Sequence, residues 1–221
     1  MRRVFHLAET LFVCALAGAL LYGLLWVCYS RLGVAPPPEV GGIAPVSVFP
    51  WGVWAAYLLA FAALPAVWEA SRRSAGAPPV GFAWPRPLAR ETMLAVALSL
   101  VALAYVVAAT AAAHSRLPRA LVAGNALFFV VNWAVFAAAE ETLFRGFLQR
   151  RLARVFRLWL AILLAAALWA FGGHWRSPPL ENLYLRLPVG LALGWLYGRS
   201  GSLLPPILAH WLINLGVTAG L

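Results

Sequence analysis

The sequence predicts an all-α fold, a polytopic membrane bundle with about seven transmembrane helices. Of the 221 residues, 63% are hydrophobic and only 11% are charged, whereas an average soluble domain is about half apolar and about a quarter charged. A soluble domain of this size cannot remove so much apolar surface from water, so the chain needs lipid as its solvent. A third indication is the alternation of long apolar runs with short stretches rich in Arg, Pro and Gly.

The first half of the chain predicts three membrane spans. The apolar run that ends near Tyr29 is longer than the core of a signal peptide, so we interpret it as a retained first helix. Pro65 lies near the end of the second apolar run and predicts a kink there. The second and third spans are predicted at about 51–68 and 92–113, and the stretch between them, 69–91, is an extramembrane linker rich in Arg and Pro.

The second half of the chain predicts four more helices. The fourth is long enough to cross the membrane with a tilt, and the last begins at two prolines, which suit the first turn of a helix. These helices are predicted at about 120–151, 158–171, 187–197 and from 205 to the end. We therefore divide the chain into an N-terminal part, 1–115, and a second part, 116–221.

The charges predict the orientation in the membrane. All basic residues are Arg and all acidic residues are Glu, and the net charge is +10. The arginines occupy short connectors between apolar runs, where they orient the protein and contact anionic lipids, so we do not expect nucleic acid as a partner. A cytoplasmic N-terminus places eleven arginines on inner connectors and five on outer ones. Abundant Arg, Ala and Pro without Lys are typical of GC-rich bacteria, so we expect a bacterial inner membrane protein.

Ionisable groups inside a membrane are costly, and each is therefore a candidate functional residue. In the fourth predicted helix, Glu141 and Arg145 are four residues apart and share one face, so they can form an ion pair. Glu140 points about 100° away from that face. This spacing predicts a supporting role for Glu141 and Arg145 and leaves Glu140 free to react. The alternative is a pair of carboxylates at the membrane interface.

Two further polar clusters lie in the later helices. His174 ends an aromatic and glycine-rich stretch, and a helical hairpin that turns near Arg157 would bring it to the depth of Glu140. His210 and Asn214 are four residues apart and share one face of the last helix. Such a pair can also be a simple hydrogen-bonded contact between membrane helices.

Together these clusters resemble the CPBP family, the CAAX proteases and bacteriocin-processing intramembrane proteases, which include the Rce1-type prenyl-protein endopeptidases. Three ordered motifs carry the resemblance: Glu140-Glu141-x-x-x-Arg145, the stretch that ends in His174, and His210-x-x-x-Asn214. The segment from Gly194 to His210 is also similar to the family pattern. The resemblance covers roughly residues 135–218.

One motif departs from the family pattern. The middle motif of the family is usually Phe-x-x-x-His, but position 170 is Ala in this chain. The aromatic role therefore falls either to Phe171 or to Trp169.

The resemblance implies hydrolysis of a peptide bond inside the membrane by residues 116–221. Glu140 would be the general base for water, His174 would position that water, and His210 with Asn214 would stabilise the oxyanion. A carboxylate in a poorly hydrated site is a competent base. None of these motifs places a Ser or Cys as an activated nucleophile, which argues against a covalent mechanism.

A metal is an open alternative. Glu140, His174 and His210 are a reasonable set of ligands for a divalent ion such as zinc. They come from three helices, however, and the chain lacks a His-Glu-x-x-His motif. We expect no obligatory cofactor.

The expected partners are the lipid bilayer and a membrane-anchored protein or peptide substrate. A non-catalytic scaffold or immunity protein and a proton-coupled transporter are the alternative functions. The transporter is disfavoured because the sequence shows no inverted repeat. The sequence does not specify an oligomeric state.

Overall fold

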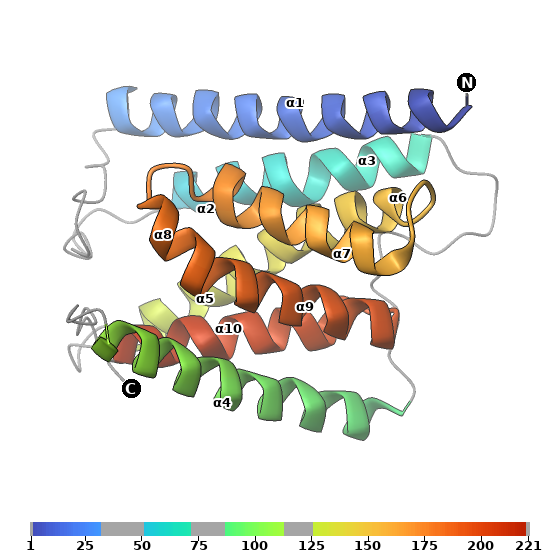
Figure 1. The fold of residues 1–221 in the computed structure, drawn as a ribbon. Helices are drawn as coiled ribbons and strands as arrows, with labels where there is room; N and C mark the ends of the chain where they lie inside the picture. The colour runs from blue at the N-terminus through green and yellow to red at the C-terminus, as the bar shows by residue number, and fades with distance from the viewer. Residues whose placement is uncertain (1, 32–50, 72–86, 113–125, 220–221) are drawn as a thin grey trace.

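The computed structural model describes residues 2–31, 51–71, 87–112 and 126–219, and within these ranges all regular structure is helical. The described residues form seven continuous helices, which confirms the predicted fold class and helix number (Figure 1). Three are simple: α1 (Arg2–Arg31), α4 (Leu88–Ala112) and α10 (Leu204–Ala219).

The other four helices contain π-helical stretches, marked η, in which the backbone turn is wider than in an α-helix. The second helix consists of α2 (Trp51–Tyr57), η1 (Leu58–Ala63) and α3 (Leu64–Ser71), and the fourth of α5 (Ala126–Glu141), η3 (Thr142–Gln149) and α6 (Arg150–Leu152). The fifth consists of α7 (Leu158–Ala167) and η4 (Leu168–Gly173), and the sixth of α8 (Pro179–Glu181), η5 (Asn182–Arg186) and α9 (Leu187–Ser200).

Four of the helices are long and apolar enough to cross a membrane. They are Val4–Cys28, Trp51–Ser71, Leu88–Ala109 and Leu127–Leu152, with 21 to 26 residues each. Two shorter apolar helices, Leu158–Gly173 and Leu204–Thr218, accompany them. Most of the large apolar side chains on α1, such as Phe5, Phe12 and Trp26, are exposed to the surroundings of the bundle, as expected for helices whose solvent is lipid.

The helix boundaries differ from the predicted ones in two places. The sixth helix runs from Pro179 to Ser200 instead of 187–197, because Pro179 starts it and Gly201 ends it. The ends of the predicted linker 69–91 are helical, since α3 continues to Ser71 and α4 begins at Leu88. The predicted helix start near residue 120, the turn at 116–119 and most of the linker lie outside the described residues.

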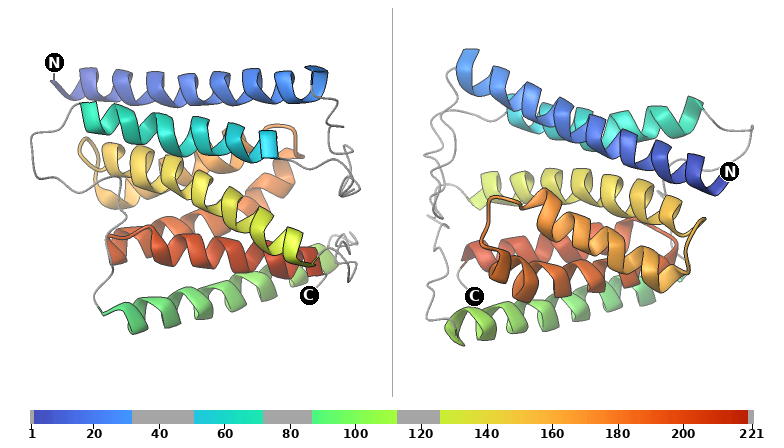
Figure 2. Two further views of the ribbon diagram at one scale, coloured as in Figure 1. Left: turned by 180° about the vertical axis from the view of Figure 1, so that it is seen from behind. Right: turned by 45° about the horizontal axis from the view of Figure 1, so that its top comes forward.

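The helices run roughly side by side, with α1 at one edge of the bundle and α4 at the other (Figures 1 and 2). Helix α1 packs on α2 and α3, α5 packs on α2 and α10, and α10 also packs on α4. Helices α7 and α9 pack on each other. Helix α1 begins and α10 ends at opposite ends of the bundle, as an odd number of passes requires (Figure 1).

A buried ion cluster joins α1, α3 and α6. The Arg151 guanidinium lies 2.7 Å from Glu69 and 3.2 Å from Glu9, and all three residues are at most 8% exposed. Arg150 adds a second contact to Glu69 at 2.9 Å, and the Trp68 indole donates a hydrogen bond to Glu9. Because Glu9, Glu69 and Arg151 are shielded from water, each depends on its partners from the other helices.

A tight turn connects α9 to α10 and fixes the start of the last helix. Gly201 has a positive φ of 65° and its N–H bonds to the carbonyl of Tyr197, which ends α9 in the left-handed conformation that glycine adopts without strain. The hydroxyl of Ser202 then accepts a hydrogen bond from the N–H of Leu204. This turn places His210 in the second turn of a helix whose first turn contains two prolines.

Candidate active site

The centre of the candidate site lies where α5 passes into the π-helical stretch η3. Glu141 is the last residue of α5, and Arg145 lies within η3. Both side chains are completely buried, and Nη1 of Arg145 lies 2.9 Å from Oε1 of Glu141. The predicted ion pair is therefore confirmed. A π-helical turn inside an α-helix is frequent at functional sites.

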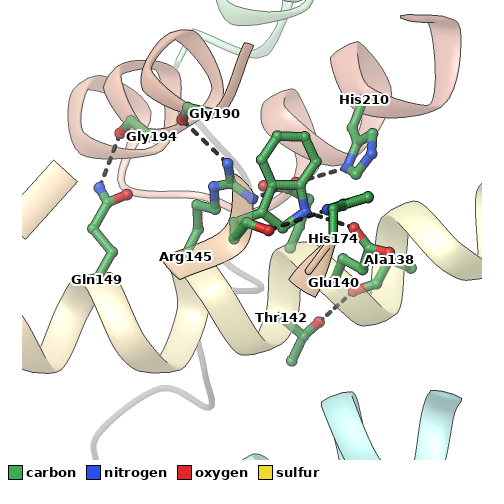
Figure 3. Close-up of polar contacts among 11 residues, drawn as sticks. Ala138, Glu140, Thr142, Arg145, Gln149, His174, Gly190, Gly194 and His210 are labelled. Carbon is green, nitrogen blue, oxygen red and sulfur yellow. Dashed lines mark hydrogen bonds and ion pairs between the residues drawn. The ribbon is translucent and has the colours of Figure 1, made fainter. Parts of the chain in front are cut away.

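Arg145 and Gln149 also hold helix α9 by its backbone. Arg145 donates to the carbonyl of Gly190 at 3.1 Å, and Gln149 donates to the carbonyl of Gly194 at 2.9 Å, so both pairs bridge 45 positions. A methyl group at Gly194 would lie 2.8 Å from Oε1 of Gln149, so this approach requires glycine. Figure 3 shows the two side chains pointing toward these glycines. Sequence reasoning missed Gln149 and Gly190, although each pair has the four-residue spacing of one helix face.

His210 reaches the same carboxylate from helix α10. Its Nδ1 lies 2.8 Å from Oε1 of Glu141, and the residue is 4% exposed. Glu141 thus contacts two nitrogen atoms through one oxygen, while its Oε2 has no hydrogen-bond partner among the residues that the structure describes. The resemblance assigned His210 to the oxyanion and did not predict this contact.

Glu140 points to a different partner, as its position on the helix predicted. Its Oε2 accepts a hydrogen bond of 2.7 Å from the indole Nε1 of Trp169 in η4. This contact confirms that the hairpin of α6 and α7 brings the two helices together at the depth of Glu140. Trp169 is 4% exposed and Phe171 is 39% exposed, so Trp169 is the aromatic residue of the middle motif that faces the site.

His174 follows η4 directly and is held from both sides. Its Nδ1 lies 3.1 Å from the backbone carbonyl of Trp169, and its own carbonyl accepts a hydrogen bond from the side-chain amide of Asn182. A carbonyl can only accept, so Nδ1 of His174 carries a hydrogen and Nε2 does not when the ring is neutral. In Figure 3 the labelled side chains of Glu140, His174, Arg145 and His210 converge on one region.

Asn214 lies one turn beyond His210 on α10 and is half-buried. Its backbone carbonyl accepts a hydrogen bond from the hydroxyl of Thr218. Its side-chain amide makes no hydrogen bond to any residue in the described part of the chain. Five of the six predicted site residues are therefore connected. Glu141 contacts Arg145 and His210, and Trp169 bonds to Glu140 and His174. The Asn214 amide keeps free donors.

The metal alternative named Glu140, His174 and His210 as ligands. Within the described ranges, no group of three or more His, Cys, Asp or Glu side chains is arranged to hold a metal ion. The Glu140 carboxylate contacts an indole N–H and His210 contacts Glu141 instead. A dependence on metal stays a prediction.

Residues 122–216 match a family model described as Rce1-like, type II CAAX prenyl endopeptidase. The match contains all six predicted site residues and agrees with the predicted resemblance to the CPBP proteases. Comparison with curated proteins and with solved structures gave no match. Together with the four helices that are long and apolar enough to cross a membrane, this similarity indicates an integral membrane protein.

Proposed function

We propose that this protein hydrolyses a peptide bond of a membrane-anchored protein or peptide with a water molecule that Glu140 activates. The observation that carries this proposal is the division of labour between the two adjacent carboxylates. Glu141 is bonded by Arg145 and His210, whereas Glu140 is bonded by one neutral N–H group. Glu140 therefore keeps lone pairs that can take a proton from water.

His174 supplies the second acceptor that such a water needs. With a hydrogen on Nδ1, its Nε2 accepts a hydrogen bond from one O–H of the water, while Glu140 accepts from the other. The oxygen lone pair then faces the scissile carbonyl carbon. As the new C–O bond forms, the proton passes to Glu140, and it later goes to the leaving amine nitrogen when the C–N bond breaks.

His210 and Asn214 donate hydrogen bonds to the oxyanion of the tetrahedral intermediate. Because Glu141 is paired with Arg145, it is ionised and only accepts, so Nδ1 of His210 carries a hydrogen. A second donor on Nε2 then requires His210 to be an imidazolium. Glu141 is the carboxylate that would face this imidazolium, because it lies 2.8 Å from Nδ1. The free amide of Asn214 provides the other donor.

The chain's surroundings are also part of the proposal. We place the protein in a bacterial inner membrane with a cytoplasmic N-terminus, and we expect a bacteriocin precursor, a C-terminal sorting tail or a similar membrane-anchored peptide as substrate. No obligatory metal is required, because Glu140 and His174 supply both acceptors for the water. A zinc ion held by Glu140, His174 and His210 would polarise the carbonyl and acidify the water instead.

The deciding experiment compares Glu140→Gln with the parent on one cleavable membrane peptide in detergent. Glutamine keeps the shape of the side chain but cannot take the proton, so kcat falls by roughly two to four orders of magnitude. Asn214→Ala lowers kcat by roughly two to three orders with an unchanged KM. Glu91→Gln is the matched control, because Glu91 is buried in α4 and pairs with Arg199 away from the site. Normal cleavage by the Glu140 and Asn214 variants would reject the roles of these two residues, whereas a parent that cleaves no membrane peptide would leave a non-catalytic scaffold as the function.

A further inference from the structure

Trp169 contacts four of the predicted site residues, although it was not itself predicted as a site residue. Its indole N–H bonds to Glu140 at 2.7 Å and its backbone carbonyl bonds to His174. The guanidinium of Arg145 lies 5.2 Å from the centre of its ring, and the His210 ring meets it edge to face at 5.5 Å. One residue thus touches the base, the water-positioning histidine and the charged pair behind them.

We propose that Trp169 is a positioning residue that sets the orientation of the Glu140 carboxylate and the tautomer of His174. This inference rests on the proposed function. A carboxylate held by a single N–H group keeps one oxygen in place and leaves the other to face the water. The carbonyl of the same residue places the hydrogen of His174 on Nδ1 and leaves Nε2 as an acceptor. Both acceptors for the water are therefore aligned by one side chain and its backbone.

The surrounding helices pack closely against the Trp169 ring. Trp169 is 4% exposed and lies in the π-helical stretch η4. A methyl group at Gly190 would lie 3.0 Å from Cε3 of its ring, so the glycine of α9 gives the indole its space. Arg145 bonds to the carbonyl of that same glycine. The ring is thereby clamped between α9 and the charged pair, with its N–H directed at Glu140.

Packing alone does not require this arrangement. A phenylalanine would keep an aromatic ring at this position but would carry no hydrogen-bond donor. Only the N–H group distinguishes the two residues in the contact with Glu140. A purely structural Trp169 would therefore tolerate a ring without a donor, whereas a positioning Trp169 would not.

The experiment uses Trp169→Phe in the full-length protein, with Trp54→Phe as the matched control. Trp54 is 7% exposed and its indole donates to Asn132 at 2.9 Å, between α2 and α5. We expect Trp169→Phe to lower kcat by roughly 10- to 100-fold with an unchanged KM, because one charge-assisted hydrogen bond is lost. Trp54→Phe leaves kcat at the parental value.

A double-mutant cycle separates positioning from packing. In a Glu140→Gln background, Trp169→Phe causes no further loss of the residual rate if Trp169 acts through Glu140. A multiplicative loss in that background overturns the proposal. Benzothienylalanine at position 169 replaces the N–H by sulfur at nearly constant shape, so it repeats the test if the phenylalanine variant unfolds.

The two proposals fail in distinguishable ways. A parental kcat in Trp169→Phe, together with an inactive Glu140→Gln, rejects the role of Trp169 and keeps the role of Glu140. A parental kcat in Glu140→Gln rejects the proposed function itself.

Discussion

Nδ1 of His210 lies 2.8 Å from Oε1 of Glu141, the same oxygen that Arg145 contacts at 2.9 Å. This relationship connects α10 with α5, two helices that carry different motifs. It also makes Glu141 the counter-ion of two cationic groups when His210 is an imidazolium. Glu141 therefore supports the oxyanion donor directly, in addition to holding Arg145.

The first prediction concerns Glu141→Gln. The amide oxygen can still accept from Arg145, but the negative charge that stabilises a His210 imidazolium is gone. We expect kcat to fall by roughly 10- to 100-fold, less than in Glu140→Gln, with little change in KM. Steady-state kinetics of both variants on one peptide test this order. An inactive Glu141→Gln variant together with an active Glu140→Gln variant would show that the roles of the two carboxylates are exchanged.

The second prediction concerns Arg145→Ala. This change removes Arg145 as a partner of the buried Glu141 carboxylate and also removes the bond to Gly190, so the free energy of unfolding falls by about 3–5 kcal/mol. Thermal unfolding in detergent measures the loss. Arg154→Ala is the control, because Arg154 is exposed and its removal costs little. A variant that is as stable as the parent but inactive would assign Arg145 to the chemistry.

The third prediction concerns the close contact between η3 and α9. In Gly194→Ala the new methyl group lies 2.8 Å from Gln149 and 2.9 Å from Ile162, so the helices must separate, at a cost of about 1–3 kcal/mol. Gly18→Ala is the matched control, since a methyl group at Gly18 has no atom within 4 Å. Melting temperatures of both variants decide. Equal stability of the two would show that η3 and α9 can part without cost.

The fourth prediction concerns metal dependence. Incubation of the purified protein with EDTA or 1,10-phenanthroline leaves kcat unchanged, because Glu140 and His174 activate the water without an ion. Metal analysis of the same sample provides an independent measurement. Loss of activity that zinc restores would identify Glu140, His174 and His210 as ligands instead.

The fifth prediction concerns orientation in the membrane. After replacement of Cys14 and Cys28 by Ala, a cysteine introduced at position 80 is modified by a permeant maleimide but not by an impermeant one added outside intact cells. The linker 69–91 is cytoplasmic in the proposed orientation, because it carries four of the inner arginines. Labelling by the impermeant reagent would show that the orientation is the opposite of the proposed one.

The sequence was sufficient to predict the features that are set within a single helix. Apolar run lengths predicted the seven helices, and the four-residue spacing predicted the Glu141–Arg145 pair. Both follow from the periodicity of a single helix. The divergence of Glu140 from Glu141 also follows from that periodicity, and the structure confirms it through the separate partners of the two carboxylates.

The remaining features depend on how helices rotate against one another, which a single sequence does not specify. The contact of His210 with Glu141 joins positions 69 residues apart. The π-helical stretches η3 and η4 shift side chains relative to an ideal α-helix, so the direction of Trp169 could not be derived from spacing. Gly190 and Gly194 accept through backbone carbonyls, which have no signature in the residue type.

The ion cluster around Arg151 affects whether the segment that matches the family model can fold without the N-terminal helices. The family match begins at residue 122, yet Arg151 within it is neutralised by Glu9 and Glu69, which come from α1 and α3. A fragment that starts at residue 122 would leave the Arg151 guanidinium without these two carboxylates, at a cost of several kcal/mol. A fusion of this segment to other N-terminal helices therefore needs an acidic residue that pairs with Arg151, or the replacement of Arg151 by an apolar residue.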